Sequence, residues 1–166
     1  MLVCGIGPVE AAISTATAIA TERPAAILHV GIAGARAASG IALGSLIVGT
    51  ASRYADLRVG LEWAPSEITA DVALVAAVRR VVPTALERMI GTSARIGGTR
   101  DCDVEAMEGF AVLRAAAHAG IPGIEIRAIS NQIEESDRSR WRFDDAFEAI
   151  IGATPALVTE VAACVN

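Results

Sequence analysis

Two glutamates and an asparagine are the first candidates for functional residues in this 166-residue chain. Glu105 and Glu108 lie three apart in the stretch VEAMEGFAV, where an alanine-rich helical pattern begins. A carboxylate can accept two charge-assisted hydrogen bonds from a vicinal diol such as that of ribose, and Met107 beside it would offer a soft apolar surface to a sugar. The alternative is an acid favoured only by the helix dipole, by ~0.3–1 kcal/mol.

Asn131 follows the strand-like stretch GIEIRAIS. An amide at the carboxyl end of a strand would lie where ligands of α/β folds bind. The alternative is that the side chain only closes an Asx turn.

Two glycine-containing stretches allow both a ligand and a packing interpretation. VGIAGA (30–35) follows an apolar run, and its glycines would let either a ligand or another segment approach the backbone. GIGPVE (5–10) resembles a dinucleotide-binding turn, but Glu10 occupies the third glycine position and no ribose-binding acid follows about 20 residues later. A tight turn into a helix is the favoured interpretation of GIGPVE.

Strand-like and helical patterns alternate along the chain, which predicts an α/β fold in a single domain spanning residues 1–166. The strand pattern with little polar alternation at 123–130 is typical of a sheet covered on both faces. Residues 1–7 predict a short buried strand followed by a glycine turn, and further strands are predicted at 25–34, 44–55, 88–98 and 123–130. The predicted helices cover 8–22, 70–82, 105–120 and 142–165, the last as one or two helices interrupted near Gly152 and Pro155.

Composition narrows the class of protein. Hydrophobic residues make up 53% of the chain and the net charge is −5 without a basic stripe, so disorder, nucleic-acid binding and anionic membranes are not expected. Cys4, Cys102 and Cys164 form no CxxC pair, which favours a reduced cytoplasm. His29 and His118 lack metal-ligand spacing, so no metal site is predicted and His29 is interpreted as structural. Neither a signal peptide nor a transmembrane helix is predicted, because glycine, proline or charge breaks the apolar stretches.

Four segments in order resemble the purine nucleoside phosphorylase and methylthioadenosine nucleosidase superfamily: GIGPVEAAISTA, HVGIAGA, VEAMEGFAV and IRAISNQ. This resemblance implies a three-layer fold, with a central mixed sheet flanked by helices. It also implies a small-molecule nucleoside substrate, no cofactor, no metal, a cytoplasmic location and a homodimer or larger homo-oligomer.

Within that superfamily the chain looks most similar to the futalosine hydrolases, which cleave futalosine to hypoxanthine and dehypoxanthine futalosine in menaquinone biosynthesis. EAMEGF, AISN and SNQIEESDRSRW carry this resemblance. Nucleosidases for adenine compounds usually have aspartate at the position of Asn131. A carboxylate only accepts, which suits the N7–H and the 6-amino group of a departing adenine, whereas an amide can accept from N7–H and donate to the O6 of hypoxanthine. Asn131 therefore indicates a 6-oxopurine.

The resemblance also assigns roles to individual residues. Glu108 would bind the ribose 2′- and 3′-hydroxyls close to the positive charge of an oxocarbenium-like transition state, and Asn131 would stabilise the leaving base. The expected substrate contacts are Ala33 and Gly34 between base and sugar, Met107 against the ribose, and Arg95 and Ile96 in a loop that meets the base through its backbone.

Two other functions stay open at this point. A purine nucleoside phosphorylase would need a phosphate site, for which Arg36 is the one candidate, and a non-catalytic nucleoside-binding protein is the other alternative. The resemblance further places a strand and a water-activating acid before the GIG turn, and the chain begins at Met1 inside what would be the second or third strand. Glu10 is the only acid in residues 1–12, and it is expected on the following helix.

Overall fold

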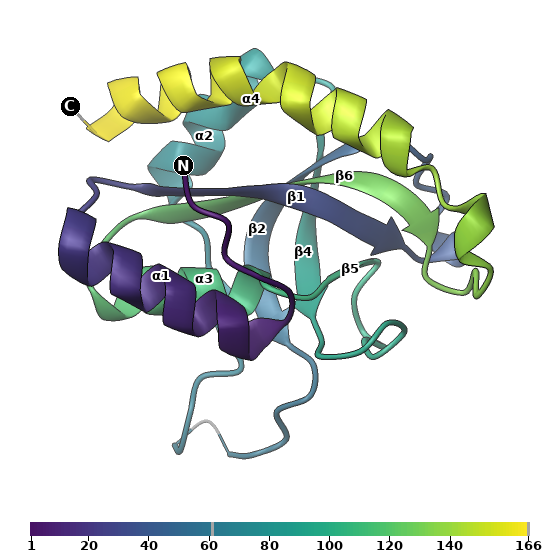
Figure 1. Cartoon of the computed structure of the whole chain (residues 1–166), viewed down its shortest axis with the longest axis horizontal. Coiled ribbons are helices and arrows are strands. Elements are labelled where there is room, and N and C mark those ends of the chain that lie inside the picture. Colours follow the sequence, from purple (N-terminus) through teal and green to yellow (C-terminus); the bar gives the residue numbers. More distant parts are fainter. Residues whose placement is uncertain (61, 166) are drawn as a thin grey trace.

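A computed structural model describes residues 1–60 and 62–165, and it shows a mixed sheet between two layers of helices (Figure 1). The strand order is β3-β2-β4-β5-β1-β6, and β2 also pairs with β6. Five of the six strands therefore form a closed barrel, and β3 pairs with β2 outside it. The strands are β1 (Ile27–Ala35), β2 (Leu46–Tyr54), β3 (Glu67–Thr69), β4 (Leu86–Thr92), β5 (Val104–Ala106) and β6 (Gly123–Gln132).

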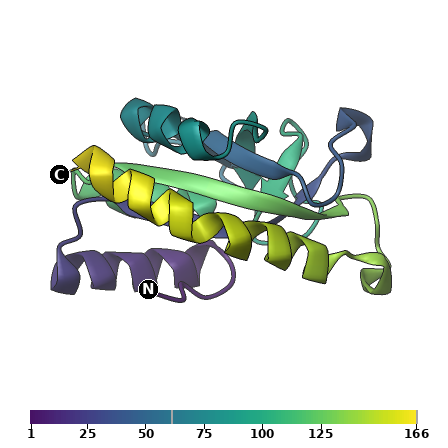
Figure 2. The same cartoon turned by 90° about the horizontal axis from the view of Figure 1, so that it is seen from above.

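The helices lie in two layers, as the sequence pattern predicted for a sheet covered on both faces (Figures 1 and 2). One layer pairs α1 with α3, and the other pairs α2 with α4, which runs along β1 and β6. The main core lies under α2 and α4, where Leu74, Val78 and Leu157 pack against Ile124 and Ile126 of β6. The helices are α1 (Pro8–Glu22), α2 (Val72–Val81), α3 (Gly109–His118) and α4 (Phe143–Val165), with short 3₁₀ turns at Ala37–Ser39 and Arg138–Arg140.

The parallel strands β1 and β6 position most of the side chains of the candidate site. The pairing runs from Ile27 opposite Gly123 to Ala35 opposite Gln132. It shifts register between Ala33 and Gly34, because Ala33 lies opposite Ile129 whereas Gly34 lies opposite Asn131. The extra residue in β6 is a β-bulge, and such bulges re-aim side chains.

The helix predicted at 105–120 is wrong in its first turn. Val104–Ala106 forms β5, which pairs antiparallel with Gly34 and Ala35 and parallel with β4. Pairing with two strands overrides the helical preference of this stretch, and α3 begins at Gly109 with Glu108 as its N-cap residue. The strand predicted at 88–98 likewise ends at Thr92, after which the chain leaves the sheet.

The strand predicted at 1–7 is also wrong. Residues 1–5 have no regular secondary structure, and Met1, Leu2 and Val3 are exposed. The helix after them has the predicted bounds, because Gly7 starts it with φ 87° and Pro8 occupies its first turn.

The interruption predicted near Gly152 and Pro155 is absent, since α4 is a single helix. Its buried residues Ala146, Ile150, Leu157 and Val161 continue one face across Pro155, so packing on the sheet holds both halves in register. By length and composition α4 is apolar enough to cross a membrane, which a helix packed in the core of a soluble protein can also be.

Candidate active site

Glu108 lies at the junction of β5 and α3, and its carboxylate has two partners. Oε1 accepts a hydrogen bond from the backbone N–H of Gly7 at 3.2 Å, and Oε2 accepts one from Nη2 of Arg127 at 3.2 Å. The side chain is 13% exposed. The GIGPVE stretch is therefore a turn into α1, as predicted, and one of its backbone donors holds the candidate sugar-binding carboxylate.

Arg127, on β6, is the centre of a buried charge cluster that also contains Glu108, Glu125 and His29. Arg127 was not identified from the sequence. Its Nε donates to Oε1 of Glu125 at 2.8 Å, its Nη2 reaches Nε2 of His29 at 2.5 Å, and its Nη1 donates to the carbonyl of Ile32 at 3.2 Å. The signal in the sequence was the pair of opposite charges two apart in the apolar stretch GIEIRAIS, because residues i and i+2 of a strand share a face.

Burial sets the protonation of this cluster. Burial raises the pKa of Glu125, and Arg127 beside it opposes that change. Burial, and then the charge of Arg127, lower the pKa of His29 well below its usual range. Since a guanidinium only donates, Nε2 of the neutral His29 accepts the hydrogen bond and the proton is on Nδ1. Burial also disfavours the charged form of Arg127, but Glu125 and Glu108 outweigh it and raise its pKa.

Asn131 is buried, with 5% of its surface exposed, and its amide orientation is fixed. The Ser130 hydroxyl donates to Oδ1 at 2.8 Å, and Nδ2 donates to the carbonyl of Gln132 at 2.9 Å. A carbonyl oxygen only accepts, so the amide nitrogen must face Gln132. Each end of the amide retains one further capacity: Oδ1 can accept once more, and Nδ2 has a second N–H to donate.

The two glycines of VGIAGA make room for these polar side chains. Gly31 lies opposite Arg127 and Gly34 lies opposite Asn131 on the neighbouring strand. A Cβ at Gly31 would overlap the guanidinium, and one at Gly34 would lie 3.0 Å from Nδ2 of Asn131. Close packing at these glycines is therefore confirmed, but both lie within β1 and not in a turn, and the groups that they accommodate belong to the candidate site.

Two predicted substrate contacts, Ala33 and Gly34, lie on β1 next to the end of β6 that carries Asn131. Gly31 and Gly34 are three residues apart, so their partners Arg127 and Asn131 are separated by about 10 Å along the strand. Ala33 lies between the two glycines, with its carbonyl oxygen 3.2 Å from the Ser130 hydroxyl oxygen. Met107 is half-buried immediately before Glu108.

Glu105 has a different task from Glu108. On β5 it lies opposite Gly34 and is 5% exposed. Its carboxylate accepts from the backbone N–H of Gly97 at 2.5 Å, and from both the N–H and the hydroxyl of Thr99 at 2.7 Å. Arg95 and Ile96 are exposed on this loop. Glu105 thus holds the predicted base-contacting loop at the end of the sheet that carries Asn131.

Arg36 is occupied by the same loop. Its guanidinium donates to the carbonyls of Thr99 at 2.7 Å and Cys102 at 3.3 Å, and it pairs with Glu134 at 3.4 Å. Arg36, the one phosphate-site candidate from the sequence, therefore holds this loop in place through its hydrogen bonds.

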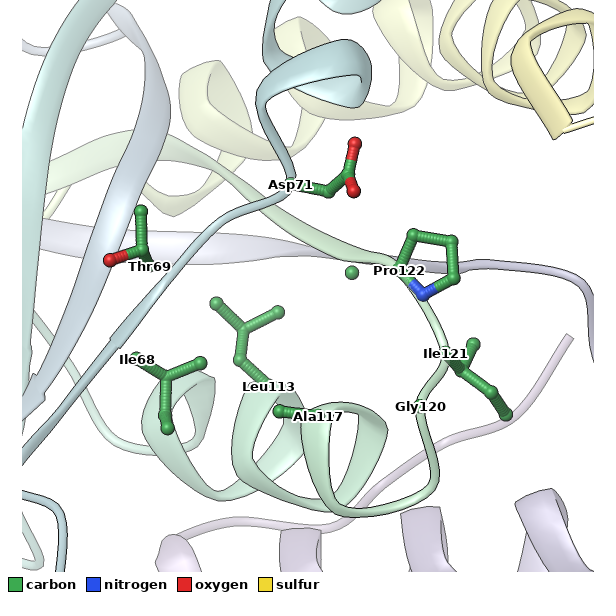
Figure 3. Close-up of a pocket in the computed structure, with 9 residues that line it drawn as sticks. Ile68, Thr69, Asp71, Leu113, Ala117, Gly120, Ile121 and Pro122 are labelled. Carbon is green, nitrogen blue, oxygen red and sulfur yellow. The ribbon is translucent and has the colours of Figure 1, made fainter.

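The cleft in Figure 3, of about 350 Å³, lies elsewhere. It is lined by residues such as Asp71, Leu113 and Gly123, at the start of β6. Asn131 is eight residues further along β6, about 26 Å away by strand geometry. Among residues 1–60 and 62–165 no group of three or more His, Cys, Asp or Glu side chains could hold a metal ion.

The mixed sheet between two helix layers, with a carboxylate at the start of α3 and a guanidinium and an oriented amide on β6, fits the nucleoside phosphorylase and hydrolase fold. Residues 1–163 match the family model of the phosphorylase superfamily, and the chain belongs to that family. A curated relative, the futalosine hydrolase of Streptomyces coelicolor, is 33% identical over 95% of this chain and 77% of its own length.

Two solved structures share the fold. The futalosine hydrolase of Helicobacter pylori matches with a TM-score of 0.84 at 17% identity, over 95% of this chain and 77% of that one. The 5′-methylthioadenosine/S-adenosylhomocysteine nucleosidase of Neisseria meningitidis, in complex with methylthio-immucillin-A, matches with a TM-score of 0.79 at 22% identity, over 96% of this chain and 78% of that one.

Proposed function

We propose that this protein hydrolyses the N-glycosidic bond of futalosine and releases hypoxanthine. The chain is an N-ribosyl hydrolase, like its Streptomyces coelicolor relative. The substrate is a purine ribonucleoside, and the reaction needs neither a metal nor an organic cofactor. We place the enzyme in the cytoplasm, in menaquinone biosynthesis, as a homodimer or larger homo-oligomer.

The observation that carries the choice of base is the fixed amide of Asn131. Because Gln132 accepts from Nδ2 and Ser130 donates to Oδ1, the two remaining capacities of the amide are one acceptor and one donor. The N7–H of a departing hypoxanthine matches the acceptor, and its O6 matches the donor. Adenine offers donors at both positions, so it would leave the free N–H of Asn131 facing another donor.

Glu108 supports the sugar half of the mechanism. Its carboxylate would accept from the ribose 2′- and 3′-hydroxyls and lie close to the anomeric carbon, where positive charge develops as the bond to the base breaks. A carboxylate interacts more strongly with the oxocarbenium-like transition state than with the neutral ribose, and this difference lowers the barrier. Asn131 cannot donate a proton as an acid, so the proton reaches the base from solvent or the base leaves partly anionic.

Two competing functions differ from this one in specific contacts. A phosphorylase would need a free cation for phosphate, and Arg36 is bonded to two loop carbonyls and to Glu134. The Neisseria meningitidis neighbour of this chain is a 5′-methylthioadenosine/S-adenosylhomocysteine nucleosidase. A nucleosidase that releases adenine would need a base-contacting group that only accepts hydrogen bonds.

The test is base release from futalosine, inosine and methylthioadenosine, each with and without phosphate. We expect futalosine to be cleaved fastest and phosphate to have no effect. Stimulation by phosphate would show a phosphorylase, and a preference for methylthioadenosine would show an adenine nucleosidase. Tight hypoxanthine binding without turnover of any nucleoside would show a binding protein.

A further inference from the structure

The carboxylates of Glu108 and Glu125 both pair with the guanidinium of Arg127, and their different surroundings indicate different roles. We infer that Glu125 is a positioning residue: it acts as the permanent counter-ion of Arg127, and so leaves the carboxylate of Glu108 available to the ribose diol. This inference rests on the diol-binding role proposed for Glu108.

Geometry and burial separate the two acids. Glu125 is fully buried, and its Oε1 lies 2.8 Å from Nε of Arg127. Glu108 is 13% exposed, and its Oε2 lies 3.2 Å from Nη2. The shorter and fully buried contact is therefore made by Glu125, which a ligand cannot reach. The longer contact is made by Glu108, which lies next to the GIG turn.

The surroundings of Glu125 fit a fixed counter-ion. Its carboxylate lies against Gly109, the first residue of α3, where a Cβ would overlap both oxygens. A helix N-terminus favours a negative charge. Oε2 has no hydrogen-bond partner among the described residues. The Ser52 hydroxyl also lowers the pKa of Glu125, but its closest contacts are the Ile90 carbonyl and Thr92. Among the described residues, Arg127 makes the hydrogen bond to this carboxylate, at 2.8 Å.

A counter-ion matters because Glu108 must serve the ligand with charge as well as with hydrogen bonds. With Glu125 ionised, the cluster holds two negative charges against one positive charge, and His29 is neutral. Without Glu125, the guanidinium would be left with Glu108 as its only anionic hydrogen-bond partner. The Glu108 carboxylate would then be a weaker acceptor for the diol and a weaker partner for the oxocarbenium charge.

The groups that face Arg127 come from four parts of the fold. Glu125 is on β6, Glu108 is at the start of α3, and His29 and the Ile32 carbonyl are on β1. The thiol of Cys4, in the N-terminal segment, is close enough to interact with the charges of both Arg127 and Glu108. Of these, only Glu125 and Glu108 are anions hydrogen-bonded to the guanidinium.

The test replaces Glu125 by glutamine, which keeps the shape and removes the charge. Two quantities are measured: the acid limb of the pH profile of turnover, and the ratio of the dissociation constants of hypoxanthine and inosine, which reports the gain from ribose. Loss of the negative charge should move the acid limb to lower pH by about one unit, because one anion fewer opposes ionisation within the site. It should also reduce the ribose gain by about fivefold, because the diol acceptor is more fully neutralised.

The matched control is Glu105→Gln, the same change at another buried glutamate, which contacts the loop and not Arg127. It should lower turnover at all pH values without moving the acid limb. Glu125→Asp keeps the charge but withdraws it from Nε, so it should give a smaller shift in the same direction. If Glu125→Gln does not fold, that aspartate shift is the test.

An unmoved acid limb together with an unchanged ribose gain, in the glutamine variant or in the aspartate variant if it alone folds, would overturn the inference. If the unmodified protein cleaves no nucleoside, the proposed function fails by itself. In that case the ratio of inosine and hypoxanthine affinities still decides the role of Glu125.

Discussion

Replacement of Gly31 by alanine tests the arrangement of the buried charge cluster from an uncharged neighbour. The added Cβ would overlap Nη1 of Arg127, which lies directly opposite on β6. An arginine on the surface would move away at little cost. This guanidinium is buried, and it is bonded to Glu125, Glu108, His29 and the Ile32 carbonyl. Displacing it breaks these contacts while the charges remain buried.

The expected loss of stability follows from two opposing effects. Breaking a buried ion pair and leaving its charge uncompensated costs about 3–5 kcal/mol. Alanine recovers about 0.5–1 kcal/mol relative to glycine within a strand. The net loss is therefore about 3 kcal/mol, which for a chain of this size corresponds to a fall in Tm of about 6–12 °C.

Urea denaturation followed by circular dichroism measures the free energy of unfolding of the Gly31→Ala variant. The matched control is Gly152→Ala, the same substitution at a glycine inside α4 with no atom within 4 Å of the added Cβ. It should raise the stability by about 1 kcal/mol, because alanine is the better helix former. A Gly31→Ala protein as stable and as active as the unmodified one would show that Arg127 is not held against Gly31, and the description of the cluster would be wrong.

Three further predictions concern the site. Glu108→Gln should lower turnover by about 10²-fold with the fold retained, because the electrostatic contact with the transition state is lost; near-normal turnover would reduce Glu108 to a structural acid at the start of α3. Asn131→Asp should shift the ratio of kcat/KM values towards 6-aminopurine nucleosides by at least about tenfold; unaltered specificity would refute the amide argument. The pH dependence of stability should report His29. Its folded pKa is depressed, so the unfolded state binds more protons below about pH 6.5, and the free energy of unfolding should fall as pH drops below that value, by up to about 1.4 kcal/mol per unit. His29→Gln should remove that component in urea titrations at several pH values, and superimposable curves for the two proteins would contradict it.

The parts of the fold that local sequence determines were predictable. Pro8 and the glycine before it place the start of α1, and the apolar runs place β1 and β6. The start of α3 was not predictable, because Val104–Ala106 looks helical in isolation and becomes a strand only by pairing with Gly34 and Ala35. The continuity of α4 through Pro155 depends likewise on its packing against the sheet, which no local pattern records.

For the candidate site, the sequence indicated the residues proposed to meet the ligand but not those that hold them. Glu108 and Asn131 stood out because each follows or begins an element with a recognisable pattern. Arg127 and Glu125 are charges inside an apolar strand, and their pairing depends on a shared face and on the glycine opposite. The structural interpretation of His29 agrees with its buried contact with Arg127. That contact depends on the pairing of β1 with β6, which the local sequence does not reveal.

The most direct test of the central claim is a crystal structure with a C-glycosidic inosine analogue, which the enzyme cannot cleave. The account predicts that the Glu108 carboxylate accepts from both ribose hydroxyls, and that Oδ1 and Nδ2 of Asn131 lie within hydrogen-bond distance of N7 and O6. An analogue bound in the cleft near Gly123, or one whose ribose contacts neither Glu108 nor its neighbours, would contradict the account.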